Sequence, residues 1–151
     1  MTEARAKIFV VDDHAGMRKA MASFVAKEFD VIGTAASAEE ALRAEHIAEA
    51  AVVVVDVSLP QVNGIDLVRA LLERWPHLRC LMLSGHDSLT YVKRSLAAGA
   101  RGYLRKEDTA EILDGIRSVD SGGIFLCQHF RSQIPEHELQ GLVASPNDAA
   151  V

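Results

Sequence analysis

Three carboxylates in this sequence directly follow apolar runs, the place where a parallel α/β sheet holds its reactive side chains. Asp12 and Asp13 follow the run 7–11, and Asp56 follows the four valines at 52–55. A charge buried inside such a strand costs too much free energy, so Asp56 is expected at the C-terminal end, facing water or a cation. Ligands of open α/β sheets bind outside the carboxyl ends of the strands. These three carboxylates are therefore the first candidates for chemistry.

Carboxylates that meet at one point repel each other, and this repulsion indicates what the site binds. Each like-charged pair at about 4 Å costs roughly 4 kcal/mol at an effective dielectric constant of ~20. Such a cluster persists by holding a cation or by protonating one member. An all-oxygen ligand set favours Mg²⁺, which prefers a few carboxylates together with waters and phosphate oxygens. The sequence therefore predicts a magnesium site at Asp12, Asp13 and Asp56.

Phosphoryl chemistry accounts for the polar residues that follow the remaining apolar runs. An Asp beside Mg²⁺ can act as a nucleophile and form an aspartyl-phosphate. The equatorial oxygens of the transferring phosphoryl group must then be neutralised. Mg²⁺ can take one oxygen, the Lys106 ammonium a second, and the Ser84 hydroxyl with the Gly85 N–H a third. We therefore predict Asp56 as the phosphoacceptor, with Lys106 and Ser84 as its catalytic partners.

These positions require elements that meet at one edge of a sheet. Apolar runs predict strands, and apolar stripes at helical spacing predict the helices between them. The expected strands lie near 7–11, 31–35, 52–55, 78–83 and 102–104, and the expected helices near 17–25, 37–47, 65–75, 88–98 and 112–119. Capping boxes are expected at Ser37 with Glu40 and at Asp108 with Glu111. Five alternating strands and helices predict a doubly wound, five-stranded parallel α/β sheet with helices on both faces.

Length and composition indicate one globular domain. The net charge of −5 over 151 residues gives no electrostatic footprint for nucleic acid. Residues 1–7 do not resemble a signal peptide, and no apolar run approaches the length of a membrane span. Cys80 and Cys127 make neither a disulfide framework nor a metal cluster, so a cytoplasmic location is expected. We expect a domain over 6–122 and a partly disordered tail over 123–151, with a loose end at 145–148 and at most one short helix at 135–143.

In combination and order, these motifs resemble the receiver domain of two-component response regulators. The resemblance covers about residues 6–122. It rests on Asp12-Asp13, Asp56-Val57-Ser58-Leu59-Pro60 with Gly64, Ser84-Gly85, and Gly102-Tyr103-Leu104-Arg105-Lys106. Glu107 stands after Lys106, where many receivers have proline, and this looks more like the nitrate-response-type branch. That branch usually carries a helix-turn-helix DNA-binding domain, which we do not find in this sequence.

The resemblance implies a fold, a reaction and a first partner. The fold would be flavodoxin-like, with the strand order 2-1-3-4-5. Asp56 would take a phosphoryl group from a histidine kinase or a phosphotransfer protein in a phosphorelay. Asp12, Asp13 and the Ser58 backbone carbonyl would help to hold Mg²⁺. Lys106 would pair with the phosphoryl group, and the module's own chemistry would be limited to self-phosphorylation from a donor and slow hydrolysis of the acyl phosphate.

The resemblance also implies a switch, made of Ser84 and Tyr103, and an output surface. If Ser84 moves toward the phosphoryl group, Tyr103 gains space to rotate inward. The helix at 88–98 has the weakest apolar stripe, so it should shift most easily. A downstream protein or a second copy is expected to bind the face built by 88–119. No contact with a membrane is expected, and the chain alone is not expected to bind DNA.

Other interpretations exist for single residues and for the whole site. Taken alone, Ser84 is more often a turn residue and Lys106 a solvated charge. A haloacid-dehalogenase-type phosphatase would need a second Asp at the position of Ser58. A flavodoxin-like electron carrier would need a phosphate-binding loop where Asp12 and Asp13 stand. A receiver-like interaction module and the trimmed receiver of a transcriptional regulator remain as alternatives.

The histidines are not assigned to the metal site. His86, two residues after Ser84, is expected near the path of the attacking water, which leaves the lifetime of the phosphoryl group open. The remaining histidines show no ligand spacing and are expected at the surface; they are His14, His46, His77, His129 and His137.

Overall fold

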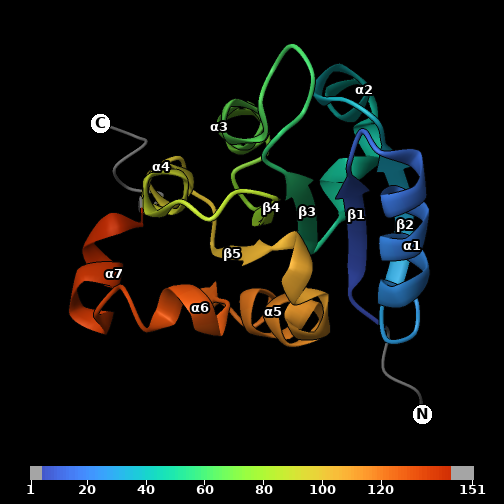
Figure 1. Ribbon diagram of the computed structural model, residues 1–151. Helices are drawn as coiled ribbons and strands as arrows, with labels where there is room; N and C mark the ends of the chain where they lie inside the picture. Colours follow the sequence, from blue (N-terminus) through green and yellow to red (C-terminus); the bar gives the residue numbers. More distant parts are fainter. Residues whose placement is uncertain (1–4, 144–151) are drawn as a thin grey trace.

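A six-stranded parallel sheet forms the centre of the molecule (Figure 1). The computed structural model describes residues 5–143, so the loose end predicted at 145–148 lies outside the described residues. The strands follow the order β2-β1-β3-β4-β5-β6, and neighbouring strands pair in parallel. The strands are β1 (Lys7–Val11), β2 (Asp30–Ala35), β3 (Val52–Asp56), β4 (Arg79–Ser84), β5 (Gly102–Arg105) and β6 (Phe125–Leu126).

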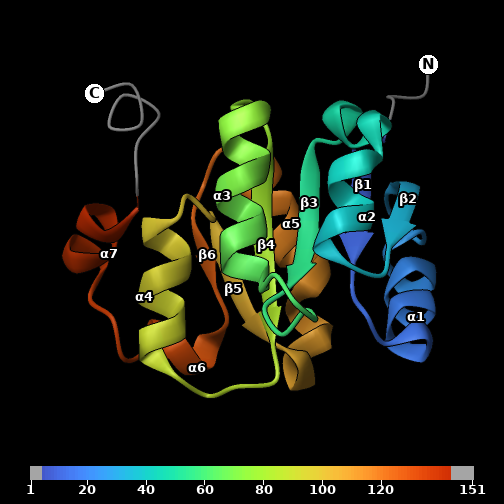
Figure 2. The ribbon, with the colours of Figure 1, turned by 90° about the horizontal axis from the view of Figure 1, so that it is seen from above.

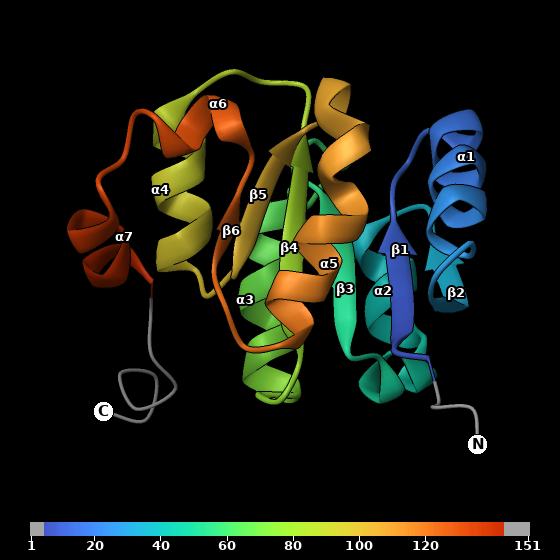
Figure 3. The same ribbon diagram turned by 90° about the horizontal axis from the view of Figure 1, so that it is seen from below.

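Helices cover both faces of this sheet and make a three-layered molecule. Figure 2 shows α2, α3 and α4 on one face, and Figure 3 shows α1 and α5 on the other. The α-helices are α1 (Ala15–Val25), α2 (Ala38–Arg43), α3 (Gly64–Arg74), α4 (Leu89–Ala97), α5 (Ile112–Asp120), α6 (Gln128–Arg131) and α7 (Glu136–Leu142). Within residues 5–143, none of these helices is long and apolar enough to span a bilayer. The prediction of a doubly wound α/β fold is confirmed.

The number of strands was predicted wrongly, because β6 was not expected. Phe125 and Leu126 pair with Gly102 and Tyr103 of β5, on the side of β5 that would otherwise be the edge of the sheet. The run of two residues is too short to show a strand period in the sequence. The order 2-1-3-4-5 is therefore present and is extended by a sixth strand.

The segment after Gly122 continues the core, whereas we expected a partly disordered tail over 123–151. Leu126, Cys127, Phe130 and Ile134 are all buried. These residues form one hydrophobic cluster with the sheet and the helices. The short helix predicted at 135–143 is present as α7, which begins after Pro135. Residues 125–134 therefore fold as part of the molecule's main body.

Of the two predicted capping boxes, the structure contains one. The Ser37 hydroxyl accepts a hydrogen bond from the Glu40 amide at 3.1 Å, so the first capping box is confirmed. The helix after it ends at Arg43 and gives way to a 3₁₀ helix, η1 (Glu45–Glu49), a common way for a helix to tighten at its end. The second capping box is wrong, because the Asp108 carboxylate is engaged elsewhere, as described below.

Candidate functional site

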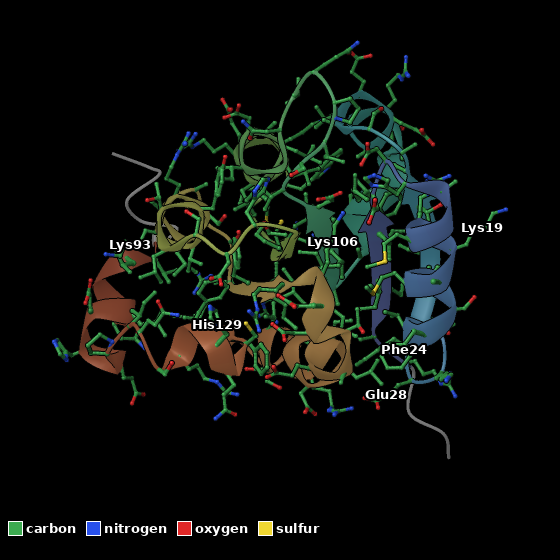
Figure 4. The ribbon with its side chains drawn as sticks, viewed as in Figure 1. Lys19, Phe24, Glu28, Lys93, Lys106 and His129 are labelled. Carbon is green, nitrogen blue, oxygen red and sulfur yellow. The ribbon has the colours of Figure 1, made fainter. Side chains whose placement is uncertain are left out.

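The predicted acidic cluster forms at the carboxyl ends of β1 and β3, and Lys106 reaches it from the end of β5 (Figure 4). The Lys106 ammonium lies 2.9 Å from Asp56 Oδ2 and 3.9 Å from Asp12 Oδ2. Asp56 and Asp12 are 1% and 2% exposed, so their attraction to the ammonium is only weakly screened by water. The structure therefore brings together the nucleophile, the metal ligands and the cation that the sequence predicts.

The loop after β3 fixes the orientation of Asp56. The Ser58 amide donates a hydrogen bond to Asp56 Oδ1 at 2.9 Å, while Lys106 contacts Oδ2. The Gly64 amide donates to the Val57 carbonyl at 2.8 Å, which folds the loop back onto the strand. A side chain at position 64 would not fit, because its Cβ would lie 2.2 Å from the Asp56 backbone oxygen. Gly64 therefore allows the close approach that holds the loop after β3 against the strand.

His14 joins the cluster, although we predicted it only as a surface residue. Its amide donates to Asp12 Oδ1 at 2.9 Å, and its ring Nδ1 lies 3.3 Å from Asp13 Oδ1. One ligand atom each from Asp12, Asp13, His14 and Asp56 lie within 4.8 Å of one another. The ring is 66% exposed, as expected for a surface histidine. The available signal was its position beside the Asp pair, at the residue before α1 begins.

The carboxylate oxygens of this cluster fit a divalent cation. Asp12 Oδ2 and Asp13 Oδ1 are buried and have no hydrogen-bond partner among the described residues. Burial raises the pKa of Asp12, the His14 amide opposes that rise, and the neighbouring Asp56 adds to it. A cation bound here would satisfy both oxygens and offset the repulsion between the carboxylates. The donor set therefore matches the predicted Mg²⁺.

Ser84 lies at the end of β4 and is fully buried. Its hydroxyl accepts a hydrogen bond from the His86 amide at 2.9 Å. Within residues 5–143, no hydrogen bond joins Ser84 to Asp56 or to Lys106. The hydroxyl oxygen thus accepts a hydrogen bond from its own loop, and the O–H remains available as a donor.

Tyr103 lies in the neighbouring strand β5 and already points inward. Its side chain is fully buried and meets the Phe130 ring edge-on, with 5.5 Å between ring centroids. Burial raises the pKa of Tyr103 to about 12, partly opposed by the nearby Ser84 hydroxyl. The Tyr103 hydroxyl has no hydrogen-bond partner of suitable geometry among the described residues. Tyr103 therefore already has the inward orientation that we expected it to reach only after Ser84 moves.

His86 lies close to the site, as expected, and it is held there by two contacts. Its Nε2 lies 3.2 Å from the Ser58 hydroxyl, and its ring packs against Tyr91 with 5.1 Å between centroids. The contact between Ser58 and His86 connects the loop after β3 with the loop after β4. The sequence placed His86 near Asp56 but gave no indication of its bond to Ser58.

Comparisons with known proteins agree with this geometry. Residues 8–117 match the family described as the response regulator receiver domain. The chain is 39% identical over 119 residues to the DNA-binding transcriptional activator DevR/DosR of Mycobacterium tuberculosis, covering 77% of this chain and 55% of that protein. It is 32% identical over 129 residues to the transcriptional regulatory protein DegU of Brevibacillus brevis, covering 83% and 55%.

A solved structure shares most of the fold. The two-component response regulator of the LuxR family from Aurantimonas superposes with a TM-score of 0.81 at 27% identity, covering 91% of this chain and 97% of that one. The chain spans only about half the length of the two transcriptional regulators named above. The matched segment includes every residue predicted for the phosphoacceptor site, from Asp12 to Lys106. The chain therefore belongs to the receiver domain family of two-component response regulators.

Proposed function

We propose that Asp56 accepts a phosphoryl group from a phosphohistidine of a histidine kinase or phosphotransfer protein. A carboxylate oxygen of Asp56 bonds to phosphorus, the phosphorus–nitrogen bond of the donor breaks, and the imidazole leaves with the electron pair and takes up a proton. The product is an acyl phosphate, which water later hydrolyses to inorganic phosphate and the free carboxylate. This protein's own part is to hold and activate the accepting oxygen.

The contact between Lys106 and Asp56 is the observation that carries this proposal. At 2.9 Å, the ammonium fixes Asp56 Oδ2 and offers a positive charge where a phosphoryl oxygen would arrive. The Ser58 amide holds the other oxygen, so the carboxylate presents one defined orientation. Ser84, one strand away, accepts from the His86 amide and keeps its O–H available to donate to a second phosphoryl oxygen.

Asp12, Asp13 and the Ser58 carbonyl are proposed to hold Mg²⁺ together with Asp56. Asp12 Oδ2 and Asp13 Oδ1 support this assignment, because both are buried without a hydrogen bond in the part of the chain that the structure describes. Bound there, Mg²⁺ would neutralise charge on the carboxylates and on the incoming phosphoryl group. Asp12 and Asp13 would then serve as positioning ligands, while Asp56 alone forms the covalent bond.

The phosphorylated module is proposed to act on a partner protein in the cytoplasm. The output surface would include the predicted 88–119 face, where a downstream protein or a second copy docks. Ser84 would report the phosphoryl group to this face through the β4–α4 loop, and Tyr103 adjoins the same path. The relatives that are transcriptional regulators support such a role in signalling, whereas the kinase and the target of this chain are open to experiment.

Intact-mass measurement after incubation with acetyl phosphate and Mg²⁺ tests the proposal. We expect one phosphate adduct on the wild-type chain and none on Asp56→Asn. EDTA should suppress the adduct. Asp66→Asn serves as the matched control, because Asp66 is an exposed carboxylate on α3 outside the cluster; it should be phosphorylated like the wild type.

Two outcomes would contradict the proposal. An adduct of equal yield on Asp56→Asn would place the phosphoacceptor elsewhere. A wild-type chain that stays unmodified by acetyl phosphate and does not bind beryllofluoride would favour the alternative, a receiver-like module that works by interaction alone.

A further inference from the structure

The face predicted for output already carries an occupant, the C-terminal segment of this same chain. We call residues 125–142 the C-terminal cap. The cap runs along β5 and then across to α4, as Figures 1 and 3 show. Its first residues extend the sheet, Phe130 meets Tyr103, and α7 contacts α4. A partner cannot reach Tyr103 or this side of α4 while the cap stays in place.

The two halves of the cap are attached with very different strength. The first half is anchored in the core, since Leu126, Phe130 and Ile134 are at most 4% exposed. The second half, α7, contains no buried residue, and no side chain caps its start. A seven-residue helix is marginal by itself, so α7 depends on its contacts with α4. Of the two halves, α7 therefore needs less free energy to detach from the rest of the molecule.

The contacts that hold the cap come from the elements next to the phosphoacceptor site. The His129 ring nitrogen lies 2.6 Å from Asp87, which stands on the β4–α4 loop three residues after Ser84. Lys93 on α4 lies 3.5 Å from Glu138 on α7 (Figure 4). Movement of Ser84 toward a phosphoryl group would draw this loop toward Asp56 and would shift α4, which follows the loop, against α7.

We propose that phosphorylation of Asp56 releases α7 from α4, while residues 125–134 remain docked. The cap is then an intramolecular ligand of the output face, and a partner gains the α4 surface only after α7 leaves it. This inference rests on the proposed function, because it takes phosphorylation of Asp56 as the signal. Phe130 already holds Tyr103 inward. The conformational change that follows phosphorylation is therefore the release of α7, and not a rotation of Tyr103.

Hydrogen–deuterium exchange on the full chain tests the release directly. The protein with Mg²⁺ is compared with and without beryllofluoride, a mimic of the acyl phosphate. Amides near Asp56, Ser84 and Lys106 should exchange more slowly with beryllofluoride, which reports binding at the site. Amides of 136–142 should exchange several times faster, while those of 125–130 should not change.

A substitution on α7 tests the same coupling from the other side. Coupling between two sites is reciprocal, so loosening α7 must favour the beryllofluoride-bound state. Glu138→Gln removes the ion pair with Lys93 and should lower the half-saturating beryllofluoride concentration by roughly 1.5- to 5-fold, the usual range for an exposed pair. Arg69→Gln is the control; it removes an exposed ion pair of 3.3 Å on α3 and should leave that concentration unchanged.

The outcomes separate this inference from the proposed function. If the site amides respond but those of 136–142 stay the same or slow down, the inference is overturned and the function stands. If Glu138→Gln binds beryllofluoride like the wild type, α7 is not coupled to the site and the inference is likewise overturned. If no amide at the site responds, the proposed function fails and takes the inference with it.

Discussion

Among the site residues, Asp12 is the carboxylate that folding places under the greatest electrostatic strain. It is 2% exposed, its Oδ2 has no hydrogen-bond partner within residues 5–143, and the Lys106 ammonium lies 3.9 Å away. Burial raises its pKa above the ordinary value of 3.8. A carboxyl whose pKa is higher in the folded state binds a proton more tightly there, so stability falls as the pH rises above 3.8. Ionisation of Asp12 therefore lowers the stability of the metal-free protein.

Asp12→Asn should raise the free energy of unfolding in EDTA at pH 7 by about 1–3 kcal/mol, because the neutral amide removes a buried charge and its repulsion with Asp56. The wild type should gain about 2.7 kcal/mol from Mg²⁺ at a hundred times its dissociation constant, and the variant should gain much less. Urea denaturation with and without Mg²⁺ measures both quantities. Asp30→Asn, an exposed carboxylate at the start of β2, should leave both unchanged. A loss of stability in Asp12→Asn without metal would show that Asp12 is not strained.

The placement of the candidate site residues was largely predictable, whereas their contacts across loops were not. Asp12, Asp56 and Lys106 follow apolar runs, and a parallel sheet brings such strand ends together. The bond between Ser58 and His86 joins residues on two different loops, and no periodicity in the sequence encodes how those loops face each other. The same holds for His14, whose contact with Asp13 depends on the turn before α1.

Among the elements, β6 and α6 were the hardest to predict from the sequence. Two paired residues and a four-residue helix are too short for a detectable period, so we expected a loose segment. Asp108 misled the prediction for a different reason. It fits a cap by spacing, but Arg105 Nε binds it at 2.7 Å and lowers its pKa, and its backbone lies in the 3₁₀ helix η2 (Lys106–Glu111). A nearby guanidinium competes better for the carboxylate than the backbone amides do.

Phe130→Ala tests whether the cap's first half belongs to the core. Phe130 is fully buried against Tyr103, so its loss should lower the free energy of unfolding by about 3–5 kcal/mol. His137→Ala, an exposed position on α7, should change it by no more than about 0.5 kcal/mol. Urea denaturation of both variants gives the comparison. Equal stability of Phe130→Ala and the wild type would restore the expectation of a loose segment after residue 122.

For the molecule as a whole, charge and the short elements after the sheet determine what it is expected to bind. The net charge is −5, and the two helices of the cap, α6 and α7, have four and seven residues. Both pack against the receiver fold instead of forming a separate unit. The longer relatives carry names of transcriptional regulators, and this chain spans 55% of two of them.

We expect no sequence-specific DNA binding by this chain alone, phosphorylated or not. An acidic molecule gains little counterion release on DNA, so any association should be weak. Electrophoretic mobility of labelled promoter fragments, with and without beryllofluoride and at two salt concentrations, measures this. A specific shift that weakens with added salt would contradict the expectation.

The pairing of β6 with β5 also has a consequence for handling the protein. Without β6, the outer hydrogen-bonding groups of β5 would be free, and Tyr103 would lose the Phe130 ring that covers it. Open strand edges with apolar side chains recruit other chains and promote aggregation. A chain shortened after Gly122, the boundary suggested by the sequence, should therefore precipitate more readily than one that continues through Leu142. The cap thus protects the solubility of the sheet as well as covering one of its faces.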